Sequence, residues 1–142
     1  MLRSLMLALV VLFSAATAHA EAVDVRMYKS PQCGCCEEYA KYLREHGFNV
    51  TVTPTNDLAQ ISRENGVPED LAGCHTMLIG GYVVEGHVPA GAINKLLAEK
   101  PKIKGISLPG MPEGSPGMSG VKTGPFEILE IADGPAKVFA RD

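Results

Sequence analysis

The residues of this chain best suited to chemistry are its four cysteines, three of which fall within four positions. These three are Cys33, Cys35 and Cys36, and the fourth is Cys74, far downstream. Three thiols so close together cannot all pair with one another, because bridges between near neighbours are strained. The cluster therefore points to metal binding or to redox chemistry.

Dithiol exchange is one interpretation, because Cys33 and Cys36 have the spacing of a thiol–disulfide oxidoreductase. Exchange requires neither Cys35 nor Cys74, however. Such enzymes also typically carry a proline before their third strand, where this chain has His75. The other interpretation is a metal site, since four converging thiols suit a soft ion.

Ligand pattern and charge balance favour copper over zinc in such a site. A zinc site of four cysteines usually takes two separated ligand pairs, whereas this arrangement is three plus one. Four thiolates carry four negative charges, of which one Zn²⁺ neutralises half. Several Cu⁺ ions bridged by shared sulfurs neutralise more, and Cu⁺ accepts two or three ligands. We therefore expect Cu(I), and more than one ion.

Methionine and histidine side chains are further candidate ligands. Met111 and Met118 lie in a glycine- and proline-rich loop with little core to fill, and thioethers bind Cu(I). Met118 is the stronger candidate, and Met111 is left open. Met27 and Met77 fall inside predicted strands, where methionine usually fills the core. His87 is expected beside the cysteines, either as a metal ligand or as a hydrogen-bond donor to a ligand.

The other histidines are weaker candidates, and whether His75 is a ligand is left open. His75 follows Cys74 directly, and neighbours in an extended chain point to opposite faces. If Cys74 faces the cluster, His75 should therefore face away unless the backbone bends there. His46 is expected to be solvated at a helix end, and His19 belongs to the expected leader.

Apolar spacing predicts the elements that must position these groups. Alternation predicts strands over residues 23–28 and 48–53, with a helix between them that ends at Gly47. Asp57 and Gln60 resemble a capping box that starts a short second helix. The later predicted elements are a strand over residues 76–79, a two-residue turn at 80–81, a strand over 82–85 and a helix over 89–100. One long loop over 100–125 and a hairpin of two strands, 126–131 and 137–141, complete the chain.

This order, βαβαββα, is that of an α/β thioredoxin-like domain, here followed by a Met/Gly/Pro-rich loop and a C-terminal β-hairpin. In such a domain the first two strands are parallel through a right-handed crossover. The third strand is antiparallel to the first, and the fourth is parallel to it. The end of the first strand, the start of the third and the end of the fourth then meet. The sequence thus predicts that Cys33–Cys36, Cys74 and His87 converge.

The first 20 residues are expected to be a signal peptide. Arg3 is positive, residues 5–13 are apolar, and residues 18–20 form a small-x-small cleavage site. The apolar run is too short for a transmembrane helix, which needs about 20 residues. Residues 21–142 are therefore expected to form one periplasmic domain with no stable membrane insertion.

Charge and compartment limit the partners. The formal net charge is −3 and no basic stripe occurs, so nucleic acid is not an expected partner. An oxidising compartment favours disulfides. Free thiols there need a reason to persist, and bound metal is one.

Several stretches of the chain occur together, in this order, in one known family. They are residues 33–36 (CGCC), 73–76 (GCHT), 81–90 (GYVVEGHVPA), 109–118 (PGMPEGSPGM) and 138–141 (VFAR). The chain thereby resembles the CopG-type periplasmic copper-resistance proteins, long known only as a domain of unknown function. The resemblance implies a thioredoxin-like fold, Cu(I) held by the clustered cysteines, a role in copper tolerance of the cell envelope, and other periplasmic copper-handling proteins as partners. A copper oxidoreductase role has been suggested for this family.

The function predicted from the sequence is a periplasmic Cu(I)-binding protein of copper resistance with a multinuclear copper–thiolate site. Its expected ligands are Cys33, Cys35, Cys36, Cys74, His87 and Met118. The sequence leaves open whether the protein also interconverts Cu(I) and Cu(II) by forming a Cys33–Cys36 bridge. Two other functions stay open, a thiol–disulfide oxidoreductase using Cys33 and Cys36 and a passive copper store or chaperone.

Overall fold

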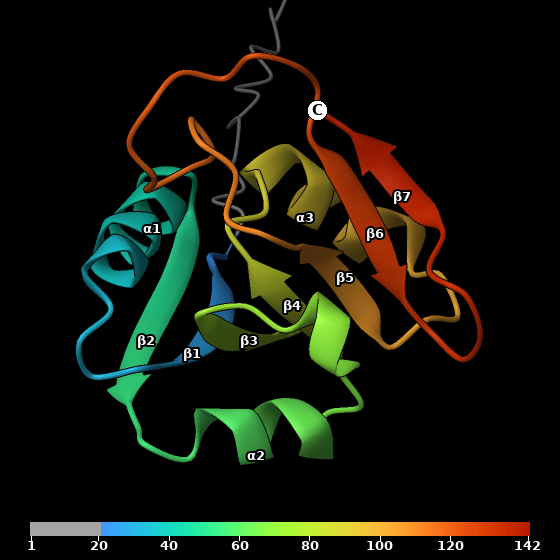
Figure 1. The fold of residues 1–142 in the computed structure, drawn as a ribbon, viewed down its shortest axis with the longest axis horizontal. Helices are drawn as coiled ribbons and strands as arrows, with labels where there is room; N and C mark the ends of the chain where they lie inside the picture. The colour runs from blue at the N-terminus through green and yellow to red at the C-terminus, as the bar shows by residue number, and fades with distance from the viewer. Residues whose placement is uncertain (1–20) are drawn as a thin grey trace, which may run out of the picture.

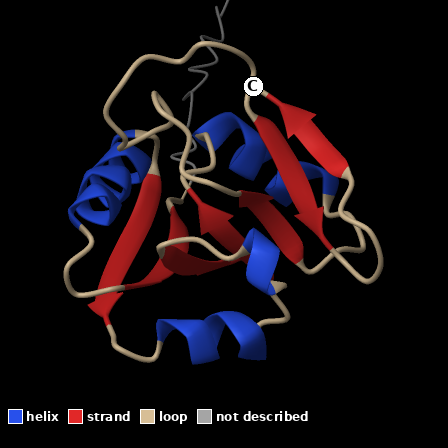
Figure 2. Cartoon of the chain, viewed as in Figure 1, coloured by secondary structure: helices blue, strands red, loops and turns tan. Residues whose placement is uncertain are grey.

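The computed structural model describes residues 21–142, so the predicted signal peptide over residues 1–20 lies outside the described residues. The described chain folds into one seven-stranded sheet with three α-helices packed around it (Figure 1, Figure 2). The elements in chain order are β1 Val23–Lys29, α1 Gly34–Glu45, β2 Phe48–Pro54, α2 Leu58–Glu64, the 3-10 helix η1 Glu69–Leu71, β3 His75–Ile79, β4 Tyr82–Gly86, α3 Ala90–Glu99, β5 Gly105–Leu108, β6 Glu127–Ile131 and β7 Val138–Arg141. Among residues 21–142, no helix combines the length and apolar character needed to cross a membrane.

The strands lie in the order β2-β1-β3-β4-β5-β6-β7. β1 is parallel to β2 and antiparallel to β3, and β4 is antiparallel to β3, so β4 runs in the same direction as β1. The end of β1, the start of β3 and the end of β4 therefore lie at one end of the sheet. The predicted α/β fold is confirmed, with the thioredoxin-like order of elements from β1 to α3.

Helices cover both faces of the sheet. On one face the main core joins Leu43 of α1 and Ile93 of α3 to the strand side chains Met27 and Met77. Both methionines are fully buried, which confirms their prediction as core residues. On the other face a smaller cluster lies beneath α2 and includes Leu71 of η1. The large core therefore supports the segment that carries the clustered cysteines.

The prediction of one unbroken loop over residues 100–125 is wrong, because β5 occupies Gly105–Leu108. All four of its residues are buried, and the strand pairs in parallel with β4. A Cβ atom at Gly105 would lie 1.7 Å from the carbonyl oxygen of Val83, so only glycine fits there. So short a strand, buried on both faces, shows no alternation by which the sequence could identify it. The loop that remains, residues 109–126 between β5 and β6, is called the methionine loop below.

The capping box predicted at Asp57 and Gln60 is also wrong. Asp57 precedes α2 but has φ −99° and ψ 20°, and its side chain makes no capping hydrogen bond. An N-cap side chain normally reaches the helix from an extended backbone. Here the Asp57 N–H instead donates to the hydroxyl of Thr55 at 3.0 Å. The short helix itself is present as predicted.

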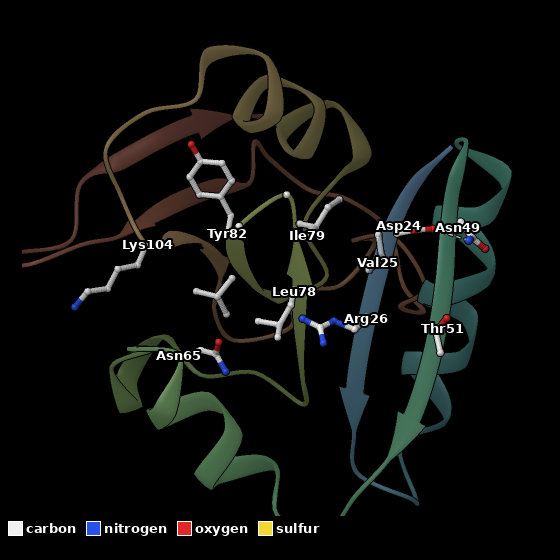
Figure 3. A pocket seen from close by; sticks show the side chains of 13 residues that line it. Asp24, Val25, Arg26, Asn49, Thr51, Asn65, Leu78, Ile79, Tyr82 and Lys104 are labelled. Atoms are coloured by element: carbon white, nitrogen blue, oxygen red, sulfur yellow. Dashed lines mark hydrogen bonds between the residues drawn. The ribbon is translucent and has the colours of Figure 1, made fainter. Parts of the chain in front are cut away.

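A cavity of about 780 Å³ lies on the sheet near the β3–β4 turn, at the end remote from the cysteines (Figure 3). Its lining includes Arg26, Leu78 and Lys104. None of the four cysteines or of the histidines in the described chain lines it. The candidate chemistry is therefore at the other end of the sheet.

Candidate functional site

The passage from β1 into α1 places three of the cysteines. Cys33 directly precedes the helix, and its N–H donates to the Ser30 carbonyl at 3.0 Å. Cys35 and Cys36 lie in the first helical turn, where Cys36 is fully buried and Cys35 is half-buried. The unpaired N–H groups and the helix dipole at this end favour negative charge on nearby sulfurs.

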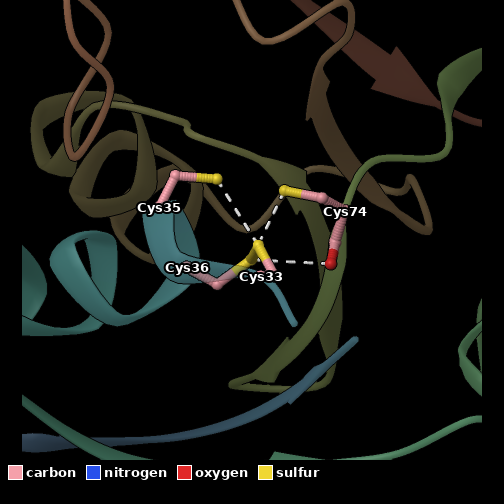
Figure 4. A group of neighbouring side chains, drawn as sticks. All are labelled: Cys33, Cys35, Cys36 and Cys74. Atoms are coloured by element: carbon pink, nitrogen blue, oxygen red, sulfur yellow. Dashed lines mark hydrogen bonds between the residues drawn. A yellow bond between two sulfur atoms is a disulfide. The ribbon is translucent and has the colours of Figure 1, made fainter. Parts of the chain in front are cut away.

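Cys74 lies in a bend immediately before β3 and faces the other three cysteines (Figure 4). Its Sγ is 3.4 Å from Cys36 Sγ, and Cys33 Sγ is 3.4 Å from Cys35 Sγ. All four sulfurs lie within 4.8 Å of one another. The structure thus brings together the four cysteines that the sequence singled out, and their binding of a metal stays a prediction.

Cys33 and Cys36 form a disulfide, whereas Cys35 and Cys74 are free thiols. Each sulfur of the bridge therefore has a free thiol beside it, Cys35 next to Cys33 and Cys74 next to Cys36. A metal ion bound by all four sulfurs requires this bridge to be reduced, because the metal ligand is the thiolate. The cluster thus has an oxidised form with two thiols and a reduced form with four.

His87 directs a ring nitrogen at the cluster. Its Nε2 lies 3.5 Å from Cys74 Sγ, and its Nδ1 lies 2.6 Å from the carbonyl oxygen of Pro116. A carbonyl can only accept a hydrogen bond, so Nδ1 carries the hydrogen and Nε2 presents its lone pair. Burial lowers the pKa of His87, which favours this neutral ring. A ring held by a backbone carbonyl in this way is the usual arrangement of a metal-binding histidine.

The expectation that His75 faces away from the cluster is wrong. Its ring is fully buried, with Nδ1 3.7 Å from Cys74 Sγ and the ring centre 5.0 Å from that of Tyr39. Cys74 lies in a bend outside β3, so the alternation of an extended strand does not separate these two neighbours. Burial, and then His87, lower the pKa of His75 to about 3. With Cys36, Cys74 and His87, His75 forms a second group of possible ligand atoms within 4.8 Å.

Cys74 is a neutral thiol, and a hydrogen bond to the residue before it fixes the backbone at this point. Burial, followed by the neighbouring Cys35, raises the pKa of the Cys74 thiol to about 12. The buried carboxylate of Glu85 on β4 accepts hydrogen bonds from the Gly73 N–H at 2.8 Å and from the Ser62 hydroxyl at 3.2 Å. Glu85 therefore fixes the residue before Cys74, a role that the sequence did not indicate because β4 is buried on both faces. A metal ion that binds Cys74 must displace its proton.

The methionine loop folds back over this end of the sheet. Gly117, with φ +78°, lies so close to α1 that a Cβ atom would come within 2.6 Å of the Tyr39 nitrogen. The preceding residue, Pro116, supplies the carbonyl that holds His87. Met118 follows directly and is half-buried. The loop backbone thus reaches the site, while ligation by Met118 stays a prediction.

Two of the residues weighed from the sequence have exposed side chains. Met111, in the same loop, is 40% exposed. His46, at the end of α1, is exposed as predicted, and its Nδ1 lies 2.7 Å from the Tyr42 carbonyl oxygen. His46 therefore serves as a solvated reference for the buried histidines of the site.

Comparisons with known proteins give one family model and two solved structures. Residues 71–118 match a model described as a protein of unknown function, DUF411. A solved structure described as copper resistance protein CopG, form 2, is 37% identical, with a TM-score of 0.79, and the match covers 86% of this chain and 99% of that one. Form 1 is also 37% identical, with a TM-score of 0.78, and covers 86% and 98%. A comparison with curated protein sequences finds no match.

Proposed function

Since the chain belongs to the family of the copper resistance protein CopG, we propose that it binds copper at the cysteine–histidine cluster and serves in copper resistance. The observation that carries this proposal is the convergence of four sulfurs and two neutral imidazole rings from three separate segments of the fold. Thiolate sulfur and imidazole nitrogen are ligands that copper accepts, and sulfur in particular selects Cu(I).

We propose further that the reduced site holds more than one Cu(I) ion. The four sulfurs form one group of possible ligand atoms, and Cys36, Cys74, His75 and His87 form a second. The two groups share Cys36 and Cys74, so bridging sulfurs can serve ions in both. Several monovalent ions also neutralise four thiolates better than a single divalent ion does.

Titration of the fully reduced protein with Cu(I) tests this function. Under anaerobic conditions and against a chromophoric Cu(I) competitor, we expect more than one equivalent of copper to bind per chain. Zn²⁺ in excess should not displace it, because the ligands are soft. A single equivalent of Cu(I) would contradict the multinuclear site, and a preference for Zn²⁺ over Cu⁺ would contradict the copper function itself.

We propose Met118 as a ligand from the methionine loop, because it follows the two residues that contact α1 and His87. Met118→Ala should weaken Cu(I) binding by about tenfold. This is the lower end of the affinity losses seen when a residue that hydrogen-bonds to a metal ligand is removed. Loss of a thioether should also change the X-ray absorption spectrum of the copper. The matched control is the exposed Met111→Ala. If Met118→Ala alters neither affinity nor spectrum, Met118 is not a ligand.

The Cys33–Cys36 disulfide favours a redox role as a second function of the same site. Oxidation of these two thiolates to the bridge releases two electrons, which reduce two Cu(II) ions to Cu(I). Protons initially on the two thiols pass to solvent. We propose this stoichiometric step as the way in which the protein interconverts Cu(II) and Cu(I), with Cys35 and Cys74 remaining as thiols.

Stopped-flow mixing of the reduced, copper-free protein with Cu(II) tests the redox step. We expect two Cu(I) ions to form for each Cys33–Cys36 bridge, which peptide mapping would detect. Cys35→Ser separates this function from dithiol exchange, because exchange with insulin does not need Cys35. Full insulin reduction together with full copper tolerance in Cys35→Ser would favour the exchange enzyme. Copper uptake with no bridge and no change of copper oxidation state would leave a binding protein.

We also propose that residues 1–20 are a cleaved signal peptide and that residues 21–142 act in the periplasm. The support is the leader pattern of the sequence, with its positive start, apolar run and small-residue cleavage site. Other periplasmic copper-handling proteins would then deliver or receive the ions.

A further inference from the structure

We infer that Lys29 is a positioning residue that makes the Cys33–Cys36 disulfide easier to reduce. Lys29 is the last residue of β1, and its side chain is only 4% exposed. Its ammonium donates hydrogen bonds to the carbonyl oxygens of Ser30 at 3.2 Å and Cys33 at 3.1 Å. It also pairs with Glu37 Oε1 at 3.2 Å. The charge is thus fixed beneath the turn that carries the bridge.

Fold stability does not explain this placement. Val25, Met27 and Lys29 alternate along β1, and all three are buried, so the lysine occupies a core position. Burying an ammonium is costly even when it is paired. The start of α1 also carries the positive end of the helix dipole, which disfavours a nearby cation. An apolar side chain would therefore suit the fold better, which points to a role for the charge.

The position of the Lys29 ammonium next to the Cys33–Cys36 disulfide indicates what its charge does. Lys29 Nζ is bonded to the carbonyl of Cys33, one of the two bridged residues. The disulfide is neutral, whereas its reduction adds two electrons and leaves negative charge on the sulfurs to the extent that they are thiolates. A fixed positive charge nearby stabilises the reduced form and gains nothing from the oxidised form. Lys29 therefore shifts the equilibrium toward the dithiol.

The inference extends the proposed function without depending on copper for its test. If the cluster binds Cu(I), an easily reduced bridge keeps all four sulfurs available, and the ammonium offsets part of their negative charge. Glu37 opposes this effect, because its carboxylate partly neutralises the ammonium. Glu37 is more than half exposed, so its influence is the weaker one.

The experiment is a redox equilibrium of the copper-free protein with glutathione at pH 7. Two glutathione molecules give two electrons and two protons to Cys33 and Cys36, the protein bridge breaks, and one glutathione disulfide forms. Trapping of thiols and mass spectrometry give the equilibrium constant. Lys29→Met should shift it about tenfold toward the protein disulfide, which is ~30 mV for a two-electron couple.

The partner variant should move the equilibrium in the opposite direction. Glu37→Gln leaves Lys29 unopposed and should shift the constant about threefold toward the dithiol, a size typical of exposed pairs. Lys41→Met removes an exposed lysine of the same helix and should have no effect. Because Glu37 is adjacent to Cys36 in the chain, loss of its carboxylate can itself favour the thiolates, so the role of the lysine charge is judged by comparing Lys29→Met with Lys29→Arg. Lys29→Arg keeps the charge and should restore most of the wild-type value.

No shift in a folded Lys29→Met variant, or a shift of both variants in the same direction, would overturn the inference. If Lys29→Met does not fold, Glu37→Gln is compared with Glu38→Gln, which removes an exposed carboxylate of α1 that does not pair with Lys29. A larger shift toward the dithiol in Glu37→Gln supports the role of the ammonium, and equal shifts refute it. Neither outcome alters the copper stoichiometry, which is measured separately on reduced protein. The inference and the copper function can therefore fail independently.

Discussion

Cys36→Ser should abolish multiple copper binding and lower Cu(I) affinity by more than about 100-fold. Loss of a residue that only hydrogen-bonds to a metal ligand already lowers metal affinity 10- to 100-fold. Cys36 is itself a possible ligand and belongs to both ligand groups. The same substitution removes the Cys33–Cys36 bridge. Competition titration with Cu(I) measures the affinity, and circular dichroism checks that the buried hydroxyl leaves the fold intact.

Cys35→Ser is the matched control for this prediction. Cys35 belongs only to the group of four sulfurs and takes no part in the bridge or in the group with His75 and His87. Its loss should reduce the copper stoichiometry without abolishing binding. Equal effects of the two serine variants would show that the two ligand groups do not act as separate parts of one site. Unchanged copper binding in Cys36→Ser would refute the cluster altogether.

Lowering the pH from 7 to 4 should make His75 destabilise the copper-free protein by about 3 kcal/mol. The pKa of His75 is about 3 in the folded protein and 6.5 for an ordinary histidine. Between these pH values the unfolded chain binds a proton at His75 and the folded chain does not. The stability from the neutral ring is complete above pH 6.5 and is lost as the pH falls from there toward 3. About 2.5 pH units of this range at 1.36 kcal/mol each give the expected size. Urea unfolding at a series of pH values measures it.

His75→Phe isolates this effect, because phenylalanine keeps a flat ring against Tyr39 but cannot be protonated. The variant should show a much shallower loss of stability between pH 6.5 and 4. Glu85 acts with the opposite sign, since burial raises its pKa, so that its contribution is present below 4.5 and is lost as the pH rises through the raised pKa. His46→Gln, at an exposed position, is the matched control for the loss of one histidine. An equally steep loss in His75→Phe would assign the acid sensitivity to other groups.

Much of the fold followed from the sequence because the helices and strands such as β1 each have one buried face and one exposed face. Val25 and Met27 alternate with exposed residues, and Gly80 and Gly81 adopt positive φ in the predicted two-residue turn. The convergence of the cysteines and His87 needed no side-chain detail. It followed from the directions of three strands, because each direction fixes which end of the sheet a residue occupies.

The features that the sequence did not predict are those without a periodic signal. β5 is four residues long and buried on both faces, so neither alternation nor length distinguished it from a loop. The direction of His75 depends on a bend at Cys74 rather than on strand geometry. Lys29 could have been noticed, since it continues the buried alternation of β1, whereas Glu85 lies in a strand with no exposed side to contrast with it.

The β3–β4 hairpin has a consequence for the order of folding events. It carries Cys74 immediately before it, His75 at its start and His87 immediately after it, whereas Cys36 is 38 residues away from Cys74 along the chain. A hairpin forms locally in about 1–10 μs, while pairing with β1 first requires closure of a long loop. The folding chain therefore holds a nitrogen-rich half-site before the thiol-rich half docks against it. Copper that arrives before docking would meet the two halves of the site separately, so the complete set of ligands is available only after the hairpin has paired with β1.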